Sequence, residues 1–255
     1  MRLRTVGLGL ATVLLILAGL MLGARYFMRQ AASAEFWESE IVAFEEADRA
    51  NRPDTGAILF TGSSSIVFWS DLEEDMAPWY VLNRGFGGAH LDHVNTYLSR
   101  IVLPYQASAI VLYAGDNDIG AGKSAKQVAD DFSRFVGRVR YSGSRAPIVF
   151  IAIKPARMRF ALWDEMTEAN RLIAEQCRSD PALFFVDIAT PMLALSPQGE
   201  PPPSDLFLFD GLHLSKKGYA LWADVVRKAI EGALRELRSY DPQTHQRSSP
   251  SSPNP

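Results

Sequence analysis

Five short apolar runs alternate with longer amphipathic segments, and this alternation constrains the fold more than any other feature of the sequence. The runs are Ala57–Thr61, Tyr80–Asn83, Ala109–Ala114, Pro147–Ile153 and Leu183–Asp187. They are almost wholly apolar, which is typical of strands buried on both faces of a parallel sheet. Helical patterns lie at about 64–76, 89–102, 124–141, 161–178 and 215–237. This order predicts an α/β fold, a three-layer αβα sandwich around a central five-stranded parallel sheet.

The segments outside this alternation set the domain boundaries. Residues 35–50 form one more amphipathic helical pattern, with an apolar stripe opposite an acidic face. Residues 196–204 are rich in proline and predict a loop, whereas residues 240–255 are rich in Ser, Pro, Asn and Gln and predict a disordered tail. We therefore expect one globular domain over residues 35–239.

The N-terminal segment, residues 1–34, has the composition of an export signal. Thr5 to Ala24 are uncharged and mostly apolar, and a helix of that length spans the hydrocarbon layer of a bilayer, about 30 Å. We expect an uncleaved transmembrane signal-anchor. The alternative is a signal peptide cut near Ala34, for which the apolar run is unusually long. Either way the globular domain lies outside the cytoplasm: membrane-anchored, and periplasmic in a Gram-negative cell, or secreted.

The charge distribution excludes one class of partner. The chain has 26 Lys and Arg against 29 Asp and Glu, but residues 1–34 hold four arginines and no acid. The remainder therefore carries 22 basic and 29 acidic residues, a net charge of −7. Nucleic-acid binding draws on clustered Lys and Arg, so we expect no nucleic acid as a partner.

Polar residues follow the predicted strands, where ligands bind in open parallel sheets. These stretches are Thr61-Gly62-Ser63-Ser64-Ser65, Asn83 to Gly88, Gly115-Asp116-Asn117-Asp118, Lys154-Pro155 and Asp210-Gly211-Leu212-His213. A catalytic serine needs an imidazole base, and that base needs a carboxylate to fix its tautomer. Of the four histidines, only His213 has an acid, Asp210, placed across a short glycine-containing turn. Spacing alone does not choose among Ser63, Ser64 and Ser65.

These blocks resemble those of the SGNH (GDSL-type) esterase/lipase superfamily in both residues and order. The similarity covers roughly residues 55–230 and implies the flavodoxin-like fold of that superfamily, hydrolysis of esters, and neither metal nor cofactor. It implies that Ser64 is the nucleophile and that His213 and Asp210 complete a triad. It also implies an oxyanion hole made by the backbone N–H groups of Ser64 and Gly88 and the amide of Asn117.

One position departs from the family pattern, since Ser63 stands where the family has the aspartate of its name. That aspartate is not a triad member, so the departure predicts different local hydrogen bonding rather than loss of activity. Among residues near the site, Lys154, Phe207 and Phe209 are predicted to contact substrate, although each also has an ordinary packing or surface explanation.

Two alternatives remain open. Asp116, Asp118, Asp210, His90, His93 and His213 could bind a metal ion for phosphoester hydrolysis. A noncatalytic carbohydrate-binding module on the same fold is the other. We expect a serine esterase acting on acetyl or short acyl esters, with a carbohydrate or a lipid as candidate alcohol.

Overall fold

A five-stranded, all-parallel sheet forms the centre of the molecule, as predicted. The computed structural model describes residues 19, 23 and 33–239. The strands are β1 (Ile58–Gly62), β2 (Val81–Gly85), β3 (Ala109–Tyr113), β4 (Ile148–Ile151) and β5 (Leu183–Val186), and their order in the sheet is β2-β1-β3-β4-β5. Gly62 lies beside Gly85 in β2 and Tyr113 in β3, so these strands end at the same edge of the sheet.

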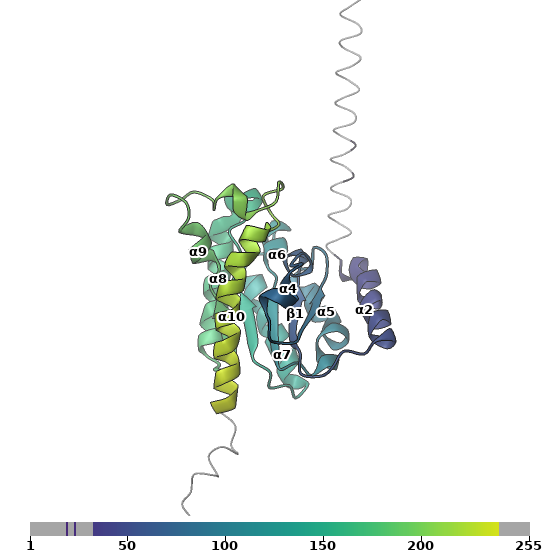
Figure 1. Cartoon of the computed structure of the whole chain (residues 1–255). Helices are drawn as coiled ribbons and strands as arrows, with labels where there is room; N and C mark the ends of the chain where they lie inside the picture. The colour runs from purple at the N-terminus through teal and green to yellow at the C-terminus, as the bar shows by residue number, and fades with distance from the viewer. Residues whose placement is uncertain (1–18, 20–22, 24–32, 240–255) are drawn as a thin grey trace, which may run out of the picture.

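Helices cover both faces of this sheet (Figure 1). The α-helices are α2 (Glu38–Ala50), α3 (Ser64–Val67), α4 (Leu72–Asp75), α5 (Leu91–Ile101), α6 (Asp116–Gly120), α7 (Ala125–Tyr141), α8 (Trp163–Arg178), α9 (Ala189–Leu193) and α10 (Lys216–Ser239). Short 3₁₀ helices are η1 (Ala34–Trp37), η2 (Leu103–Tyr105), η3 (Arg157–Leu162) and η4 (Ser204–Leu206).

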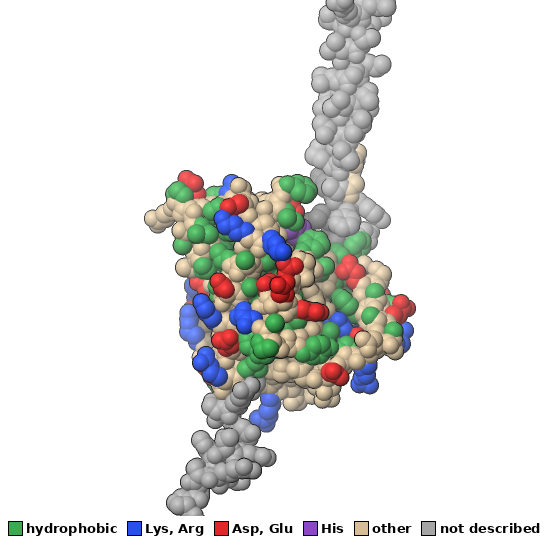
Figure 2. Space-filling model, in the orientation of Figure 1, with side chains coloured by type: hydrophobic (Ala, Val, Ile, Leu, Met, Phe, Trp, Pro, Cys, Tyr) green, Lys and Arg blue, Asp and Glu red, His purple; other side chains and the backbone are tan. Residues whose placement is uncertain are grey.

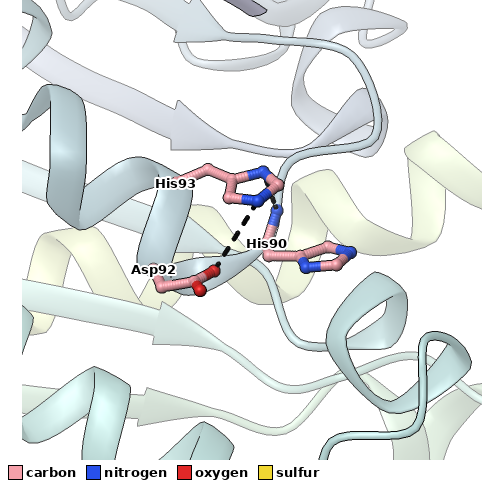
Figure 3. A group of neighbouring side chains, drawn as sticks. All are labelled: His90, Asp92 and His93. Atoms are coloured by element: carbon pink, nitrogen blue, oxygen red, sulfur yellow. Dashed lines mark hydrogen bonds and ion pairs between the residues drawn. The ribbon is translucent and has the colours of Figure 1, made fainter. Parts of the chain in front are cut away.

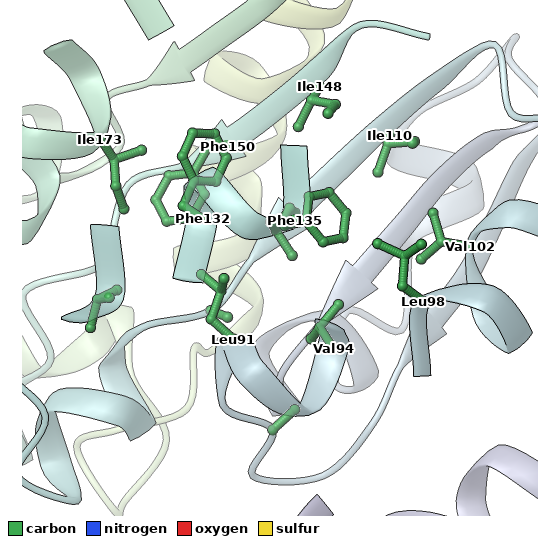
Figure 4. Packing of buried hydrophobic residues seen from close by; sticks show 14 of the residues in the cluster. Leu91, Val94, Leu98, Val102, Ile110, Phe132, Phe135, Ile148, Phe150 and Ile173 are labelled. Carbon is green, nitrogen blue, oxygen red and sulfur yellow. The ribbon is translucent and has the colours of Figure 1, made fainter. Parts of the chain in front are cut away.

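The core divides at the sheet into two layers because successive strand residues point to opposite faces. In β4, Ile148 and Phe150 pack with α5, α7 and α8, as Figure 4 shows for part of this layer. Val149 and Ile151, between them, pack on the other side against α10 and the aromatic residues near α3. This is the predicted three-layer αβα arrangement.

The structure corrects the sequence prediction in two places. The pattern at 64–76 is not one helix: α3 ends at Val67 and α4 begins at Leu72. Ser70 and Asp71 lie in the break, and both residue types have low helix propensity. The short helices α6 and α9, which the sequence did not predict, follow β3 and β5.

The predicted anchor at residues 1–34 falls almost wholly outside the described residues, as does the predicted tail at 240–255. Within residues 33–239, the helices are too short or too polar to cross a bilayer. Acidic and basic side chains are interspersed over the face of the molecule shown in Figure 2, rather than separated into a basic surface.

Candidate active site

Ser64 stands at a sharp turn from β1 into α3. Gly62 has φ +129°, and a Cβ there would lie 1.8 Å from the carbonyl oxygen of Tyr113 on the neighbouring strand, so only glycine fits. The Ser63 N–H donates to that same carbonyl at 2.9 Å. Ser64 is then the first residue of α3, where a backbone N–H has no partner within the helix.

The Asp210–His213 segment meets Ser64 from the other end of the chain. The Nε2 of His213 lies 3.0 Å from Ser64 Oγ, and its Nδ1 lies 2.6 Å from Asp210 Oδ2. Asp210 Oδ1 accepts the backbone N–H groups of Leu212 and His213, which fixes the carboxylate. With Nδ1 donating to Asp210, Nε2 is free to accept the serine proton.

Electrostatics keep the Asp210 carboxyl ionised. Partial burial alone raises its pKa, but the bonds from His213 and the two backbone N–H groups outweigh burial, so the pKa lies below its usual range. The Phe68 ring packs edge-on against the imidazole with 4.7 Å between ring centroids. The structure thus brings together the three residues of the predicted triad, and Phe68 is a neighbour that no spacing in the sequence indicated.

The three proposed oxyanion donors also lie at this edge. The Asn117 amide donates to the carbonyl oxygen of Ala89 at 3.2 Å, so α6 touches the loop that contains Gly88. Packing requires the neighbouring Gly87, where a Cβ would lie 1.8 Å from the Trp37 ring, but a Cβ at Gly88 would meet that ring only at 3.5 Å. Packing therefore requires glycine at position 87 and not at position 88.

Lys154 does not line the substrate side of the site, and that prediction is corrected. Its side chain is 1% exposed, with Nζ bound to Asp116 Oδ2 at 2.8 Å and to the hydroxyl groups of Ser65 and Tyr113, each at 2.9 Å. All three N–H donors of the ammonium are used. The ammonium is buried because its three acceptors, on Asp116, Ser65 and Tyr113, lie together in the interior.

The two predicted phenylalanines differ from each other. Phe207 is buried and pairs with Leu214 through a β-bridge. The prediction that Phe207 contacts substrate is therefore wrong, because its side chain packs in the core. Phe209 is fully exposed. Met158, which the sequence did not single out, is also exposed, and its N–H donates to the Gly211 carbonyl at 3.0 Å.

The residues of the metal alternative are engaged by other groups. Asp118 lies 2.9 Å from the ammonium of Lys123, which also binds Asp92 and Asp131, two acids outside the predicted set, at 2.9 and 3.0 Å. Burial raises the pKa of Asp118 to about 6 despite this lysine. Asp116 is bound by Lys154, and Asp210 by His213.

The pair His90 and His93 stacks beside Asp92 (Figure 3). The Nδ1 of His93 accepts the His90 backbone N–H at 3.3 Å, so in the neutral ring Nε2 carries the proton, 3.9 Å from Asp92. Burial, with the nearby His93, lowers the pKa of His90 to about 4. A cation would have to displace both that proton and the Lys123 ammonium, so the donor set fits a metal poorly.

Comparisons with known proteins agree with this geometry. The sequence matches the GDSL-like Lipase/Acylhydrolase family over residues 56–221, more than half of the chain. A comparison with curated proteins found no match.

Solved structures share the fold at low sequence identity. A protein from Streptococcus pneumoniae whose name refers to platelet activating factor aligns with a TM-score of 0.67 and 18% identity, over 83% of this chain and 97% of that one. A GDSL-like lipase from Bacteroides thetaiotaomicron aligns with a TM-score of 0.63 and 16% identity, over 76% and 98%. A variant of an acetyl-xylooligosaccharide esterase from Geobacillus aligns with a TM-score of 0.54 and 13% identity, over 70% and 95%.

The structural likenesses establish the fold, and the family match adds the chemistry. The chain belongs to the GDSL-like lipase/acylhydrolase family and is a hydrolase that acts on ester bonds.

Proposed function

We propose that this hydrolase is a serine esterase that works through an acyl-enzyme, with Ser64 as nucleophile. The observation that carries the proposal is the continuous hydrogen-bond chain from Ser64 through His213 to Asp210. The arrangement supplies a base whose tautomer is fixed and a hydroxyl within reach of it.

The reaction follows from these contacts. Ser64 Oγ attacks the carbonyl carbon of the ester while its proton passes to His213 Nε2. The bond between that carbon and the alcohol oxygen then breaks, the alcohol takes the proton from His213, and the acyl group remains on Ser64. A water molecule, giving its proton to His213, then attacks the acyl carbon. The bond from that carbon to Ser64 Oγ breaks, Oγ takes the proton back from His213, and the carboxylic acid leaves. The N–H groups of Ser64 and Gly88 and the Asn117 amide would stabilise the oxyanion in both steps.

Steady-state hydrolysis of p-nitrophenyl acetate by the wild type and by Ser64→Ala tests this proposal. We expect activity in the wild type, none above background in the variant, and no effect of a chelator. Retention of activity in Ser64→Ala would refute the serine mechanism, and loss of wild-type activity on chelation would favour the metal alternative. A wild type that binds acetylated sugars without turnover would favour the noncatalytic module.

For the substrate we propose acetyl or short acyl esters of a carbohydrate or lipid alcohol. Exposed apolar residues support an apolar group on one side of the ester. The Phe68 ring packs against His213, and Met158 and Leu208 are exposed residues whose backbone N–H groups donate to the Gly211 and His213 carbonyls. The exposed Phe209 directly precedes Asp210 in the chain. An acetyl-xylooligosaccharide esterase is among the proteins of similar fold. We expect kcat/KM to be highest from acetyl to butyryl in a chain-length series that includes acetylated xylo-oligosaccharides. A maximum at long acyl chains would contradict this choice.

We also propose that residues 1–34 anchor the enzyme in a membrane with the catalytic domain outside the cytoplasm. The uncharged run from Thr5 to Ala24 supports this topology. Fractionation should recover the full-length chain with membranes. A mature protein that begins at Glu35 would replace the anchor with a cleaved signal peptide.

A further inference from the structure

The Lys154 ammonium is connected to three neighbouring strands at the edge that carries the site. Lys154 itself follows β4. Its partners Tyr113 and Asp116 lie at the end of β3 and the start of α6, and Ser65 lies in the first turn of α3, which follows β1. These partners lie 38 to 89 residues from Lys154 in sequence. The order β1-β3-β4 within the sheet makes this convergence possible.

Two of the Lys154 partners are next in sequence to residues with proposed catalytic roles. Ser65 directly follows Ser64, and Asp116 directly precedes Asn117. From the other side, the Tyr219 hydroxyl donates to the Ser65 carbonyl at 3.0 Å. A single buried cation therefore links the turn that carries the nucleophile to the turn that carries the oxyanion amide.

The negative charge on Asp116 strengthens its hydrogen bond with the Lys154 ammonium. Burial alone raises the pKa of Asp116, but Lys154 and Arg159 together lower it to about 2. Arg159 lies 3.4 Å from the same carboxylate oxygen that binds Lys154. The carboxylate is thus ionised between two cations and shielded from water, where charge-assisted hydrogen bonds are short and hold their geometry.

We propose that Lys154 is a positioning residue that sets the separation between Ser64 and Asn117. The inference rests on the proposed function, because both residues must meet one ester carbonyl at the same time. A displacement of about 1 Å between reacting groups can cost about 10²-fold in rate. Without the ammonium, the two turns would lose their common partner, while the surfaces that bind substrate would stay in place.

The test compares Lys154→Met with Arg84→Met in the full-length chain. Arg84 is a matched control, since its side chain is also a buried cation held by an acid and a tyrosine hydroxyl, Asp48 and Tyr105. The guanidinium also donates to the Asn83 carbonyl, and none of these three partners belongs to either turn. Active sites are counted by titration to completion with a fluorophosphonate, so that kcat refers to folded, competent enzyme. We expect kcat per site on p-nitrophenyl acetate to fall about 10²-fold in Lys154→Met with KM within threefold, and to stay within twofold in Arg84→Met. Equal kcat per site in the two variants would overturn the proposal.

A second variant covers the case in which Lys154→Met does not fold. Ser65→Ala keeps the ion pair with Asp116 and removes only the link to the nucleophile turn, at little cost in volume. We expect a fall in kcat per site of three- to tenfold with unchanged KM, and an unchanged kcat would overturn the proposal. Ser64→Ala in the same assay keeps the two hypotheses apart: if it retains activity the serine mechanism fails, whereas a silent Ser65→Ala beside an inactive Ser64→Ala refutes only the positioning role.

Discussion

Replacing Asn117 with alanine separates the catalytic role of this side chain from its role in folding. The folded state loses one hydrogen bond, the 3.2 Å contact from the amide to the Ala89 carbonyl, at a half-buried position. One such bond contributes about 1 kcal/mol to stability. The transition state loses one of three proposed oxyanion donors, which typically lowers kcat by about 10²–10³-fold, or about 2.7–4 kcal/mol. The effect on catalysis should therefore exceed the effect on stability by more than twofold in free energy.

The assay pairs steady-state kinetics on p-nitrophenyl acetate with urea unfolding of the same preparations. Asn95→Ala is the matched control, because the buried amide of Asn95 also donates to a backbone carbonyl, that of Asp131 at 2.9 Å, but on α5 and outside the site. We expect Asn95→Ala to lose stability and to keep kcat. Asn117→Asp should be slower than Asn117→Ala, since a carboxylate cannot donate and repels a developing oxyanion. A kcat within threefold of wild type in Asn117→Ala would show that the amide is not an oxyanion donor.

Three further outcomes follow from the structure. Gly62→Ala should destabilise the fold by more than about 3 kcal/mol, measured by urea unfolding, because the new Cβ would lie 1.8 Å from the Tyr113 carbonyl oxygen at a φ of +129°; an unchanged unfolding midpoint would contradict the turn described. Asp210→Asn should lower kcat on the order of 10⁴-fold with little change in KM, because the amide favours the wrong His213 tautomer; activity near wild type would remove Asp210 from the triad. His90 has a pKa lowered from 6.5 to about 4, so the unfolded chain takes up its proton first as pH falls. Its contribution to stability should be complete above about pH 6.5 and decline by about 3 kcal/mol towards pH 4; urea unfolding across this range should show a slope that His90→Gln lacks, and equal slopes would mean that His90 is not buried in its neutral form.

The sheet was predictable because its signal is local. Each apolar run matches a strand to within a few residues at either end, as with the run at 109–114 and β3 at Ala109–Tyr113. Strands buried on both faces must be apolar throughout, so their composition identifies them without knowledge of their neighbours. The single helix expected at 64–76 failed for a similarly local reason, since the helix-breaking effect of Ser70 and Asp71 competes with an apolar periodicity that continues across them.

The site was predictable only in part. The Asp210–His213 spacing and the order of the blocks are visible in the sequence, and the structure brings those residues to Ser64. The place of Lys154 was not visible, because its burial depends on acceptors from the ends of two other strands, β1 and β3. Phe68 packs against His213 and the Met158 N–H bonds to the Gly211 carbonyl through conformations that follow no periodicity, so no spacing rule could select them.

The proposed mechanism requires that Ser64, and neither of the serines beside it, is the nucleophile. Treatment of the full-length protein with a fluorophosphonate, followed by peptide mass spectrometry, identifies the serine that reacts. We expect one adduct, on Ser64, formed by the wild type and absent from Ser64→Ala. An unmodified wild type, or an adduct on Ser63 or Ser65, would contradict it.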